Sequence, residues 1–471
     1  MENIEHVVAL PVNFALRIAS DYFNRQIYDV ARDILSQALV VVPNNLDAQH
    51  LYALCLSALN EKPEALKLLE QVVEQSVGKA DDSHRCIYLT NLCSFYERLN
   101  RFEEALRAGE EAERLNPKDI TLLHNLGVCH YHRRDPARAK AYAERVVALD
   151  PQRASSHLLL GESCLALGEF EQGWKEYAWR FNLPGANDPT PKLSLARWSG
   201  ESIDGRILVK GDQGFGDIFF FWRYVSWLTA FSSLPLAFSV PDDVKALLSL
   251  NAPAGSLGFA GESLDRLCAW TTLSDLPGIF GAGIKPDGIP NAPYLVPDPK
   301  RVDKWQRWLL DHVPVTNRRV GVCWAGRPEY VNDAKRSLPV GTVAKLIGVP
   351  GISMVSLQKG AREDEIPAQD GLPPAGPLFE DWLDTQACIY CLDLVITVDT
   401  GIAHLSAAMG KPTYILLPYA SEWRWGTDSN WTPWYPSAVL CRQHRPGDWT
   451  GVLENVVRFL RETVSPLAGT V

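Results

Sequence analysis

Residues 126–151 of the chain read LGVCHYHRRDPARAKAYAERVVALDP, and this stretch is one unit of a repeat. Its Gly127 belongs to a series of small residues that stand 34, 40, 34 and 34 positions apart: Ala19, Ala53, Cys93, Gly127 and Gly161. A second series has the same four intervals: Ala31, Ala65, Ala105, Ala139 and Gly173. A period of 34 residues is typical of two antiparallel helices per unit, with small residues where neighbouring helices cross closely. The sequence therefore predicts five helix pairs over residues 12–182.

Two further marks recur at fixed offsets in these units. A proline follows the second helix, which it would otherwise break, and a leucine on the buried face precedes the small residue of the first helix: Pro43, Pro117, Pro151, Leu92, Leu126 and Leu160. A six-residue insertion around Gly78–Ser83 accounts for the single longer interval. Together the marks resemble the tetratricopeptide family, which implies a concave surface that binds a partner and does not identify it.

Length and charge limit the classes of protein to consider. A chain of 471 residues exceeds what one hydrophobic core usually serves, so we expect about three folding units. A formal net charge of -10 provides no broad attraction to nucleic acid or to anionic membranes. No apolar run reaches the ~20 residues of a membrane span, and the first residues lack the basic start of a signal peptide. We therefore expect a cytoplasmic protein without a membrane span.

The cysteines indicate neither disulfides nor a metal site. Ten cysteines are scattered through apolar contexts, which is typical of reduced, buried thiols in a cytoplasm. Cys388 and Cys391 have the CxxC spacing, but no second pair or histidine cluster completes a zinc site. We expect no metal and no cofactor.

The pattern changes after the repeats. Residues 183–205 are rich in Pro, Gly and polar residues and are predicted to be a linker. Short β-branched runs then alternate with helical segments, which indicates parallel α/β units in two lobes, residues 206–300 and 301–471. The predicted strands are Ile207–Lys210, Val320–Trp324, Ser353–Leu357, Leu394–Val398 and Thr413–Leu417. The predicted helices include Asp217–Leu228, Lys304–His312, Val340–Ile347 and Ile402–Met409. A proline-rich interval, Pro286–Pro299, divides the lobes.

The first chemical feature is a glycine-rich turn, residues 207–217, which read ILVKGDQGFGD. A strand that runs into Gly214 and Gly216 and then into a helix leaves backbone N–H groups available to a ligand at the helix start. The spacing differs from the G-x-G-x-x-G of dinucleotide enzymes, so NAD is not inferred. Alternatively, this is an ordinary strand–helix turn in which Asp217 is the N-cap. The local pattern leaves both interpretations open.

The second feature is residues 396–405, ITVDTGIAHL. An apolar strand ends at Asp399, Thr400 and Gly401 open a helix, and His404 lies in its first turn. A pyrophosphate is favoured at such a place by the helix dipole and the free amides, and His404 could donate to a phosphate oxygen. Alternatively, Asp399 caps the helix and His404 is a core histidine.

The third feature is a pair of basic residues, Lys335 and Arg336, in the loop that follows Trp324-Ala-Gly326. A basic pair between a strand end and a helix start can clamp a phosphate, and an arginine can do so with two parallel hydrogen bonds. The alternative is a pair of solvated charges on a loop.

The order of these features resembles glycosyltransferase family 9, the ADP-heptose:lipopolysaccharide heptosyltransferases. The shared pattern is a glycine turn that ends in Gly-Asp, then Lys-Arg-x-x-Pro, then Val-Asp-Thr-Gly-x-x-His-Leu-x-x-Ala-x-Gly-x-Pro up to Pro412. The whole chain is similar to bacterial tetratricopeptide proteins with a glycosyltransferase-like C-terminal domain, through the tail LPYASEWRW at 417–425, PWYP at 433–436 and Arg442-Gln443. Flagellin-modifying glycosyltransferases belong among these proteins.

The resemblance implies an α-solenoid followed by a GT-B domain of two Rossmann-like lobes. It implies an enzyme that inverts the anomeric carbon without a metal, and the chain has no Asp-x-Asp motif. Asp217 matches the catalytic aspartate of the family. The nucleotide-sugar contacts fall at Gly214, Gly216, Lys335, Arg336, Asp399, Thr400, Gly401 and His404. The first lobe is short for the family, so acceptor contacts do not carry over.

Three hypotheses of function follow. In the first, a cytoplasmic glycosyltransferase moves a sugar from a nucleotide sugar to a protein, such as flagellin, that the repeats recruit. In the second, the acceptor is a glycan or a lipid-linked molecule. In the third, the chain is a scaffold with an inert GT-B domain. The O-GlcNAc transferases also join repeats to a GT-B domain, but the DTGxxH segment argues against them. The aromatic residues Trp423, Trp425, Trp431, Trp434 and Tyr435 either stack on a base or sugar or pack inside the lobes.

Overall fold

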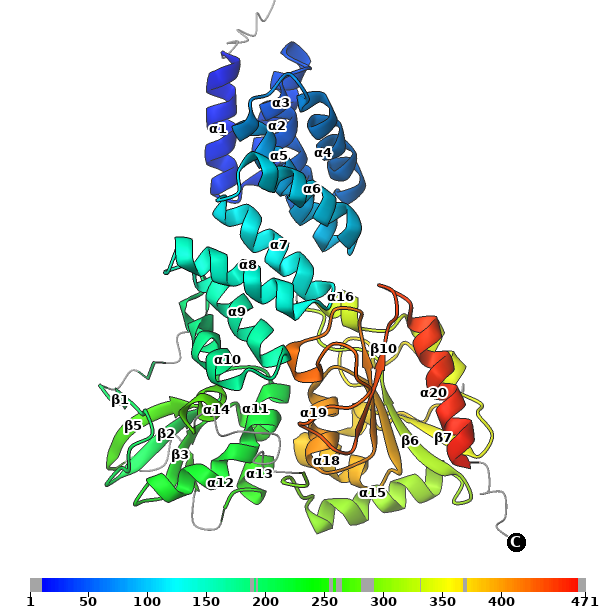
Figure 1. Ribbon diagram of the computed structural model, residues 1–471. Helices are drawn as coiled ribbons and strands as arrows, with labels where there is room; N and C mark the ends of the chain where they lie inside the picture. The colour runs from blue at the N-terminus through cyan, green and yellow to red at the C-terminus, as the bar shows by residue number, and fades with distance from the viewer. Residues whose placement is uncertain are drawn as a thin grey trace, which may run out of the picture. The chain divides into compact units, whose positions relative to one another are not determined.

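A computed structural model describes residues 11–186, 190–191, 194–253, 257–259, 265–280, 292–330, 332–366 and 371–464 (Figure 1). The chain divides into two compact units. The first comprises Met1–Arg133 and Arg138–Ser156, and the second comprises Arg134–Ala137 and His157–Val471. None of the described helices is long and apolar enough to cross a membrane.

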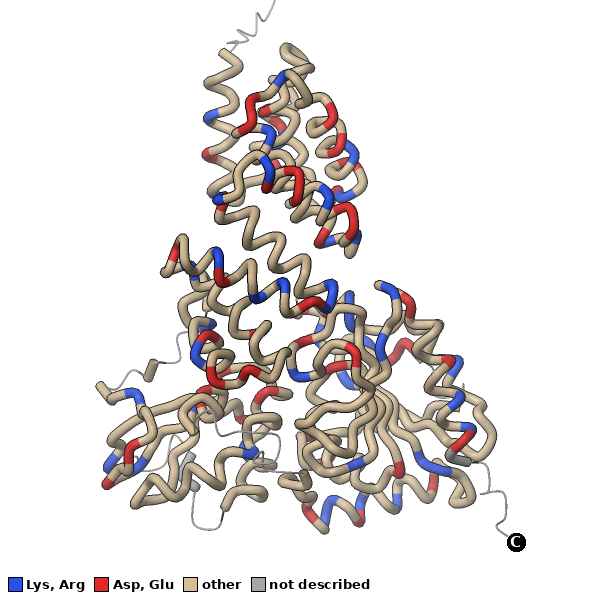
Figure 2. Tube along the Cα trace, viewed as in Figure 1, with Lys and Arg blue, Asp and Glu red and all other residues tan. Residues whose placement is uncertain are grey.

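Ten α-helices lie between residues 11 and 182, a stretch that the structure describes throughout, and they confirm the predicted helical repeats. They are α1 (Val12–Asn24), α2 (Tyr28–Val41), α3 (Leu46–Ala58), α4 (Lys62–Ser76), α5 (Asp82–Arg98), α6 (Phe102–Leu115), α7 (Ile120–His132), α8 (Pro136–Leu149), α9 (Ala154–Ala166) and α10 (Phe170–Tyr177). The predicted insertion falls in the connection between α4 and α5. Basic and acidic residues are interspersed along these helices (Figure 2), and ion pairs such as Arg145–Glu113, at 2.7 Å, join neighbouring helices of the first unit.

The turn inside each helix pair repeats with the same period as the helices. One residue per turn has a positive φ, between 59° and 76°: Gln26, Asn60, Asn100, Arg134 and Gly168. Their intervals are again 34, 40, 34 and 34. The small residues of the two predicted series are buried, and the alanines and Cys93 among them are 0% exposed. At Gly161, for example, a Cβ atom would stand only 2.6 Å from the backbone nitrogen of Tyr177, so no larger side chain fits there.

The first lobe of the second unit is a five-stranded parallel sheet of order β1-β5-β2-β3-β4. The strands are β1 (Ala196–Arg197), β2 (Arg206–Lys210), β3 (Leu236–Ser239), β4 (Leu257–Phe259) and β5 (Leu267–Thr272). The helices are α11 (Phe215–Phe221), α12 (Val225–Leu228), α13 (Asp242–Leu250) and α14 (Leu276–Ile279). Because β2 lies at the centre of the sheet, the turn that follows it opens at the carboxyl edge, where ligands of parallel sheets collect.

The second lobe is another five-stranded parallel sheet, of order β10-β9-β8-β6-β7. Its strands are β6 (Arg318–Cys323), β7 (Ile352–Ser356), β8 (Leu394–Val398), β9 (Thr413–Leu417) and β10 (Ala438–Arg442). Its helices are α15 (Pro299–His312), α16 (Asp333–Arg336), α17 (Val340–Val343), α18 (Trp382–Tyr390), α19 (Gly401–Ala408) and α20 (Trp449–Val464), and α20 lies on the opposite face of the sheet from α18 and α19 (Figure 1). The two parallel sheets confirm the predicted α plus α/β class.

Some elements differ from the sequence prediction. Part of the predicted linker pairs with β5 as strand β1, because the neighbouring Trp198, 1% exposed, anchors it in the core. The helix predicted over 217–228 begins at Phe215 and is broken by a 3₁₀ turn at Trp222–Tyr224. The helix predicted over 340–347 is α17 followed by the 3₁₀ turn Ala344–Leu346. Much of the proline-rich interval lies outside the described residues.

The division between the compact units falls inside the fifth helix pair, after Ser156, whereas the sequence places the end of the repeats at residue 182. Three side chains of this pair, Leu165, Trp174 and Tyr177, belong to the hydrophobic core that the two lobes share, and each is at most 6% exposed. Residues 157–182 are therefore part of the same compact unit as the two sheets.

Candidate functional site

The glycine turns that follow β2 and β8 meet at the first residues of α11 and α19. A Cβ atom on Gly216 would lie 2.7 Å from Cδ2 of His404 and 3.6 Å from Cα of Gly401. A Cβ atom on Gly401 would lie 3.0 Å from the ring of Trp382 and 3.8 Å from the backbone nitrogen of Gly216. Glycine at both positions thus lets one helix start from each lobe approach the other, and most of the predicted site residues of the two lobes gather here.

Asp217 lies in the first turn of α11, with a quarter of its side chain exposed. Its Oδ2 accepts a hydrogen bond of 3.2 Å from the N–H of Gly214, and its Oδ1 accepts one of 2.5 Å from Nη2 of Arg424. The N-cap residue is Gly214, so Asp217 is not the N-cap. Burial raises the pKa of Asp217 to about 6, although Arg424 acts in the opposite direction.

Arg424 is the cation that sequence reasoning did not single out. Its side chain is 3% exposed and also donates to Glu422 at 2.6 Å. The guanidinium lies 4.5 Å from the ring centre of Trp423 and 5.0 Å from that of Phe220. Burial alone would lower its pKa, but the carboxylates of Asp217 and Glu422 raise it far above the ordinary value. Arg424 is therefore a fixed positive charge, and its Nε has no hydrogen-bond partner among the described residues.

Asp399 ends β8 and lies inside a set of hydrogen bonds. Its Oδ2 accepts from the indole N–H of Trp425 at 2.9 Å, and its backbone carbonyl accepts from Nη1 of Arg336 at the same distance. Burial and the neighbouring Glu422 raise the pKa of Asp399 to about 7. The N-cap of α19 is Thr400, so Asp399 does not cap that helix.

His404 is enclosed by aromatic rings. It is 6% exposed and lies 5.2 Å from Trp425 in a stacked arrangement, and its Nδ1 is 3.0 Å from the hydroxyl of Tyr435. Its Nε2 faces Oδ1 of Asp399 at 3.8 Å. Burial, followed by the charge of Arg424, lowers the pKa of His404 far below its ordinary value. The lowered pKa favours the neutral imidazole, and this placement favours support of Asp399 and Gly216 over direct donation to a phosphate.

The start of α19 has the backbone N–H groups and the helix dipole that favour binding of an anion. Thr400 is in an extended conformation, and its carbonyl accepts the N–H groups of Ala403 and His404 at 3.0 and 3.4 Å. The amides of Gly401 and Ile402 precede these and have no acceptor within the helix, as at every helix start. The positive end of the helix dipole adds to their attraction for an anion.

The two basic residues, Lys335 and Arg336, differ in their contacts: Arg336 contacts the candidate site and Lys335 does not. Arg336 donates to Asp333 at 3.0 Å and to the carbonyl of Asp399, and its guanidinium lies 4.4 Å from the ring centre of Tyr330. Lys335 is half-buried, and its ammonium group makes no hydrogen bond or ion pair with any part of the chain that the structure describes. The geometry therefore brings Arg336 to the end of β8.

Comparison with known proteins bears on both units. The model of glycosyltransferase family 9 (heptosyltransferase) matches residues 383–450, and a tetratricopeptide repeat model matches residues 95–152 and 132–177. The chain joins tetratricopeptide repeats to a glycosyltransferase family 9 domain. The matched residues of this glycosyltransferase domain include Asp399, Thr400, Gly401, His404 and Arg424. Asp217, Gly214, Gly216, Lys335 and Arg336 lie outside the match.

The similar proteins are distant in sequence. Protein FlbA of Caulobacter vibrioides is 26% identical over 438 residues, which cover 79% of this chain and 72% of that protein. U-box domain-containing protein 70 of rice (Oryza sativa subsp. japonica) is 29% identical over 155 residues, 31% of this chain and 18% of that protein. Among solved structures, Pseudomonas aeruginosa pilF is similar over 37% of this chain and 78% of that chain, with 24% identity and a TM-score of 0.33.

Of the five aromatic residues that the sequence predicts either to stack on a ligand or to pack, four are buried and one is exposed. Trp423, Trp425, Trp434 and Tyr435 are at most 4% exposed, whereas Trp431 is 61% exposed. The buried four hold the segment that carries Arg424. In the sequence, the aromatic residues that surround Arg424 were the feature that could have pointed to a role for this arginine. The sequence alone does not distinguish aromatic rings that pack in a core from rings that bind a ligand. Of the aromatic residues predicted either to stack or to pack, only Trp431 remains free to stack on a ligand.

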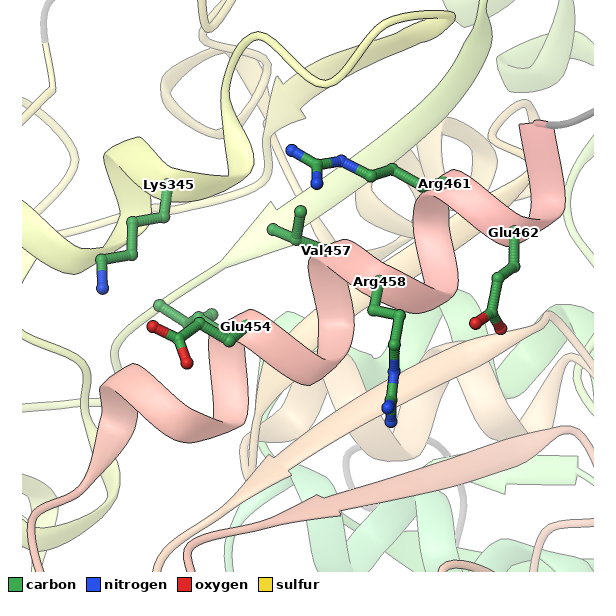
Figure 3. Close-up of a pocket in the computed structure, with 7 residues that line it drawn as sticks. Lys345, Glu454, Val457, Arg458, Arg461 and Glu462 are labelled. Atoms are coloured by element: carbon green, nitrogen blue, oxygen red, sulfur yellow. The ribbon is translucent and has the colours of Figure 1, made fainter.

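A hollow of about 580 Å³ lies elsewhere, along the outer face of α20 (Figure 3). Its lining includes Lys345, Glu454, Val457, Arg458 and Arg461, whose charges are of both signs (Figure 3). It contains none of the residues at the carboxyl edges of the two sheets. The candidate site of the glycosyltransferase domain is therefore the meeting point of α11 and α19.

The pKa of Asp217 leads to a prediction about pH. A general base must be ionised, and the carboxyl group is protonated below a pKa of about 6. Transfer should therefore be fastest above that value and fall as the pH is lowered through it, by about tenfold per pH unit. Initial rates measured from two pH units below to two above this pKa, with donor at saturation, check this. A rate that increases as the pH falls through this range would contradict the role of an ionised Asp217.

Proposed function

We propose that this glycosyltransferase moves a sugar from a nucleotide sugar to an acceptor hydroxyl in one displacement, with inversion and without a metal. The observation that supports this most strongly is the pairing of Asp217 with Arg424. The first lobe supplies the carboxylate, and the second supplies the cation and the start of α19. A base and an anion site in one place are what an inverting transfer requires.

Asp217 is proposed as the general base. It accepts the proton of the acceptor hydroxyl while that oxygen forms a bond to the anomeric carbon. The bond between this carbon and the diphosphate oxygen breaks on the opposite side, and the nucleoside diphosphate leaves with the electron pair. A carboxylate with a pKa of about 6 is ionised at neutral pH and still basic enough to take the proton as the bond forms.

The departing diphosphate is proposed to be stabilised by the second lobe. The amides of Gly401 and Ile402 and the dipole of α19 supply hydrogen bonds and a fixed positive potential. Arg424 adds a full charge on a side chain that is only 3% exposed, where it acts more strongly than in solvent. Arg336 donates to the carbonyl of Asp399 and so holds the loop at the end of β8, from which α19 begins.

The acceptor is proposed to be a protein that the tetratricopeptide repeats recruit in the cytoplasm, such as flagellin. Two features support this part of the proposal. Helical repeats of this kind present a concave surface to a partner, and the sequence resembles proteins among which flagellin-modifying glycosyltransferases belong. A tether between acceptor and active site raises the local concentration of the acceptor, by a factor of about 10²–10⁴ in favourable cases.

Deletion of the first unit tests the recruiting role. A chain that begins at residue 157 lacks the first unit and also Arg134–Ala137 of the second unit, but it keeps Trp174 and Tyr177 in the core, whereas a cut at residue 182 would remove them. We expect the shortened chain to bind a nucleoside diphosphate as the full chain does, and to modify flagellin about 10²-fold more slowly. Mass spectrometry of flagellin incubated with each chain and a nucleotide sugar measures the added sugar.

Thermal unfolding of the shortened chain, with and without the nucleoside diphosphate, is the control for folding. If the shortened chain modifies flagellin as fast as the full chain, the repeats do not recruit the acceptor. Transfer to a free glycan or a lipid-linked acceptor, with none to protein, would support the second hypothesis from the sequence. Binding of nucleotide without transfer to any acceptor would support the scaffold hypothesis.

A further inference from the structure

The last helix of the repeats packs directly on the turn that carries Asp217. The hydroxyl of Tyr177, in α10, accepts a hydrogen bond of 3.3 Å from the side-chain amide of Gln213, in the glycine-rich turn. Trp174 lies one helical turn earlier. Its ring is edge-on to those of Trp423 and Phe221, with distances of 5.3 and 6.2 Å between the ring centres. The fifth helix pair therefore contacts both the glycine-rich turn and the segment that carries Arg424.

Just beyond α10, in the 3₁₀ turn Ala178–Asn182, Arg180 forms a buried ionic cluster. Its side chain is 10% exposed and donates to Asp275 at 2.9 Å and to the hydroxyl of Ser274 at 2.5 Å. Its Nη2 lies 3.6 Å from Oδ2 of Asp212, which is 3% exposed. The guanidinium is 4.0 Å from the ring centre of Phe181. One cation of the repeats thus lies between two buried carboxylates of the first lobe.

Asp212 connects this cluster to the glycine-rich turn that carries Asp217. Its side chain accepts from both the backbone N–H, at 3.3 Å, and the hydroxyl of Ser274. Burial raises the pKa of Asp212, and the charge of Arg180 acts against that rise. Four residues separate Asp212 from Asp217, and they form the turn and the start of α11. The position of Asp212 therefore constrains where α11 begins and where the Asp217 carboxylate lies.

We propose that Arg180 is a positioning residue for Asp217. Through Arg180, the fifth helix pair of the repeats sets the position of the proposed base in the first lobe. Arg180 holds the Asp212 carboxylate at the end of β2, and this fixes the glycine-rich turn. Asp275 has a second cation, Arg197, at 2.6 Å, whereas Asp212 relies on Arg180 alone among the ion pairs of the described residues. The inference rests on the proposed function, because the rate it affects is that of sugar transfer.

The variant Arg180→Met tests the proposal, because Met keeps an unbranched apolar stem and removes the charge. We expect the kcat of transfer to fall ~10–100-fold, since a small displacement of a catalytic group has an effect of this size. The Kd for a nucleoside diphosphate probe (UDP, GDP, ADP or dTDP, whichever the wild type binds) should stay within about twofold, because its proposed site is in the second lobe. Arg266→Met is the matched control: this arginine of the same lobe is 54% exposed and pairs with Asp204 at the surface.

A second variant separates positioning from a general loss of stability. Asp212→Asn added to Arg180→Met removes the carboxylate that the first change leaves unpaired, while the amide oxygen can still accept from Ser274. We expect the double variant to regain most of the lost kcat. A purely structural role for the fifth helix pair would leave the kcat of the folded fraction unchanged in Arg180→Met, which would overturn the proposal. Failure of the double variant to recover any activity would also overturn it.

Hydrogen exchange of residues 211–217 provides a readout that does not depend on transfer. Arg180→Met should raise the exchange rate of these amides about tenfold, and the double variant should restore it. If the wild-type enzyme transfers no sugar, the proposed function fails, and exchange alone then decides whether Arg180 fixes the turn. Unchanged exchange in folded Arg180→Met overturns the inference, whatever the activity of the wild type.

Discussion

Replacing Asp217 by Asn is expected to lower the rate of sugar transfer by ~10²–10⁴-fold, the contribution that a positioned general base makes. The single amide oxygen can accept from the N–H of Gly214 or from Arg424, but not from both as the two carboxylate oxygens do, so one of these hydrogen bonds is lost. The variant also loses the capacity to take a proton, and this loss accounts for the large effect on the rate. Its affinity for a nucleoside diphosphate should stay within about twofold of the wild type. Single-turnover transfer and equilibrium binding, measured on the same preparations, check both expectations.

The matched control for this variant is Asp242→Asn. Asp242 also lies in the first turn of a helix of the first lobe, α13, but it is 91% exposed, and its ion pair among the described residues is with Lys245. If Asp217 merely stabilised a helix start, the two substitutions would have similarly small effects, because each removes one negative charge from the first turn of a helix, which is worth about 0.3–1 kcal/mol. A transfer rate in Asp217→Asn that matches the control would contradict the assignment of the base.

Replacing Arg424 by Met is expected to lower the transfer rate by ~10²–10³-fold, the effect of removing one preorganised group that stabilises developing charge. Two consequences distinguish this change from simple unfolding. The affinity for the nucleoside diphosphate should decrease by about tenfold, because one charge-assisted hydrogen bond is lost. The acid limb of the pH profile should also move to higher pH, because Arg424 lowers the pKa of Asp217 and this effect disappears.

Arg458→Met is the control for the loss of one arginine. Arg458 is exposed on α20, beside the hollow in the outer face of the second lobe, and donates only to Asn455 among the described residues. We expect full activity and unchanged nucleotide affinity in this variant. An Arg424→Met enzyme with wild-type nucleotide affinity and an unmoved acid limb would show that Arg424 acts on neither the leaving group nor Asp217.

The sequence was sufficient to predict the repeats and the order of the chemical features. Regular spacing predicted the repeats, because buried small residues such as Ala19 and Gly161 recur with the period of the helix pairs. The two glycine turns were predicted because each follows an apolar strand and opens a helix. Their direct contact, Gly216 against Gly401, depends on how two lobes pack, and no local pattern contains that information.

Other parts of the site required the structure for specific physical reasons. Arg424 is surrounded by tryptophans, and whether such rings bind a ligand or bury a cation depends on tertiary packing. The neutral state of His404 follows from its enclosure by Trp425 and Tyr435, which are 21 and 31 residues further along the chain. The strand β1 is two residues long, so it has too little pattern of its own to be recognised.

The anomeric configuration of the product tests the central claim most directly, namely that Asp217 deprotonates an acceptor that displaces the nucleotide in one step. NMR coupling constants of the anomeric proton, compared between the nucleotide sugar and the first-formed product, measure it. A single displacement with the base and the leaving group on opposite sides predicts inversion. Retention of configuration would require a second displacement or attack from the side of the leaving group, and it would contradict the account.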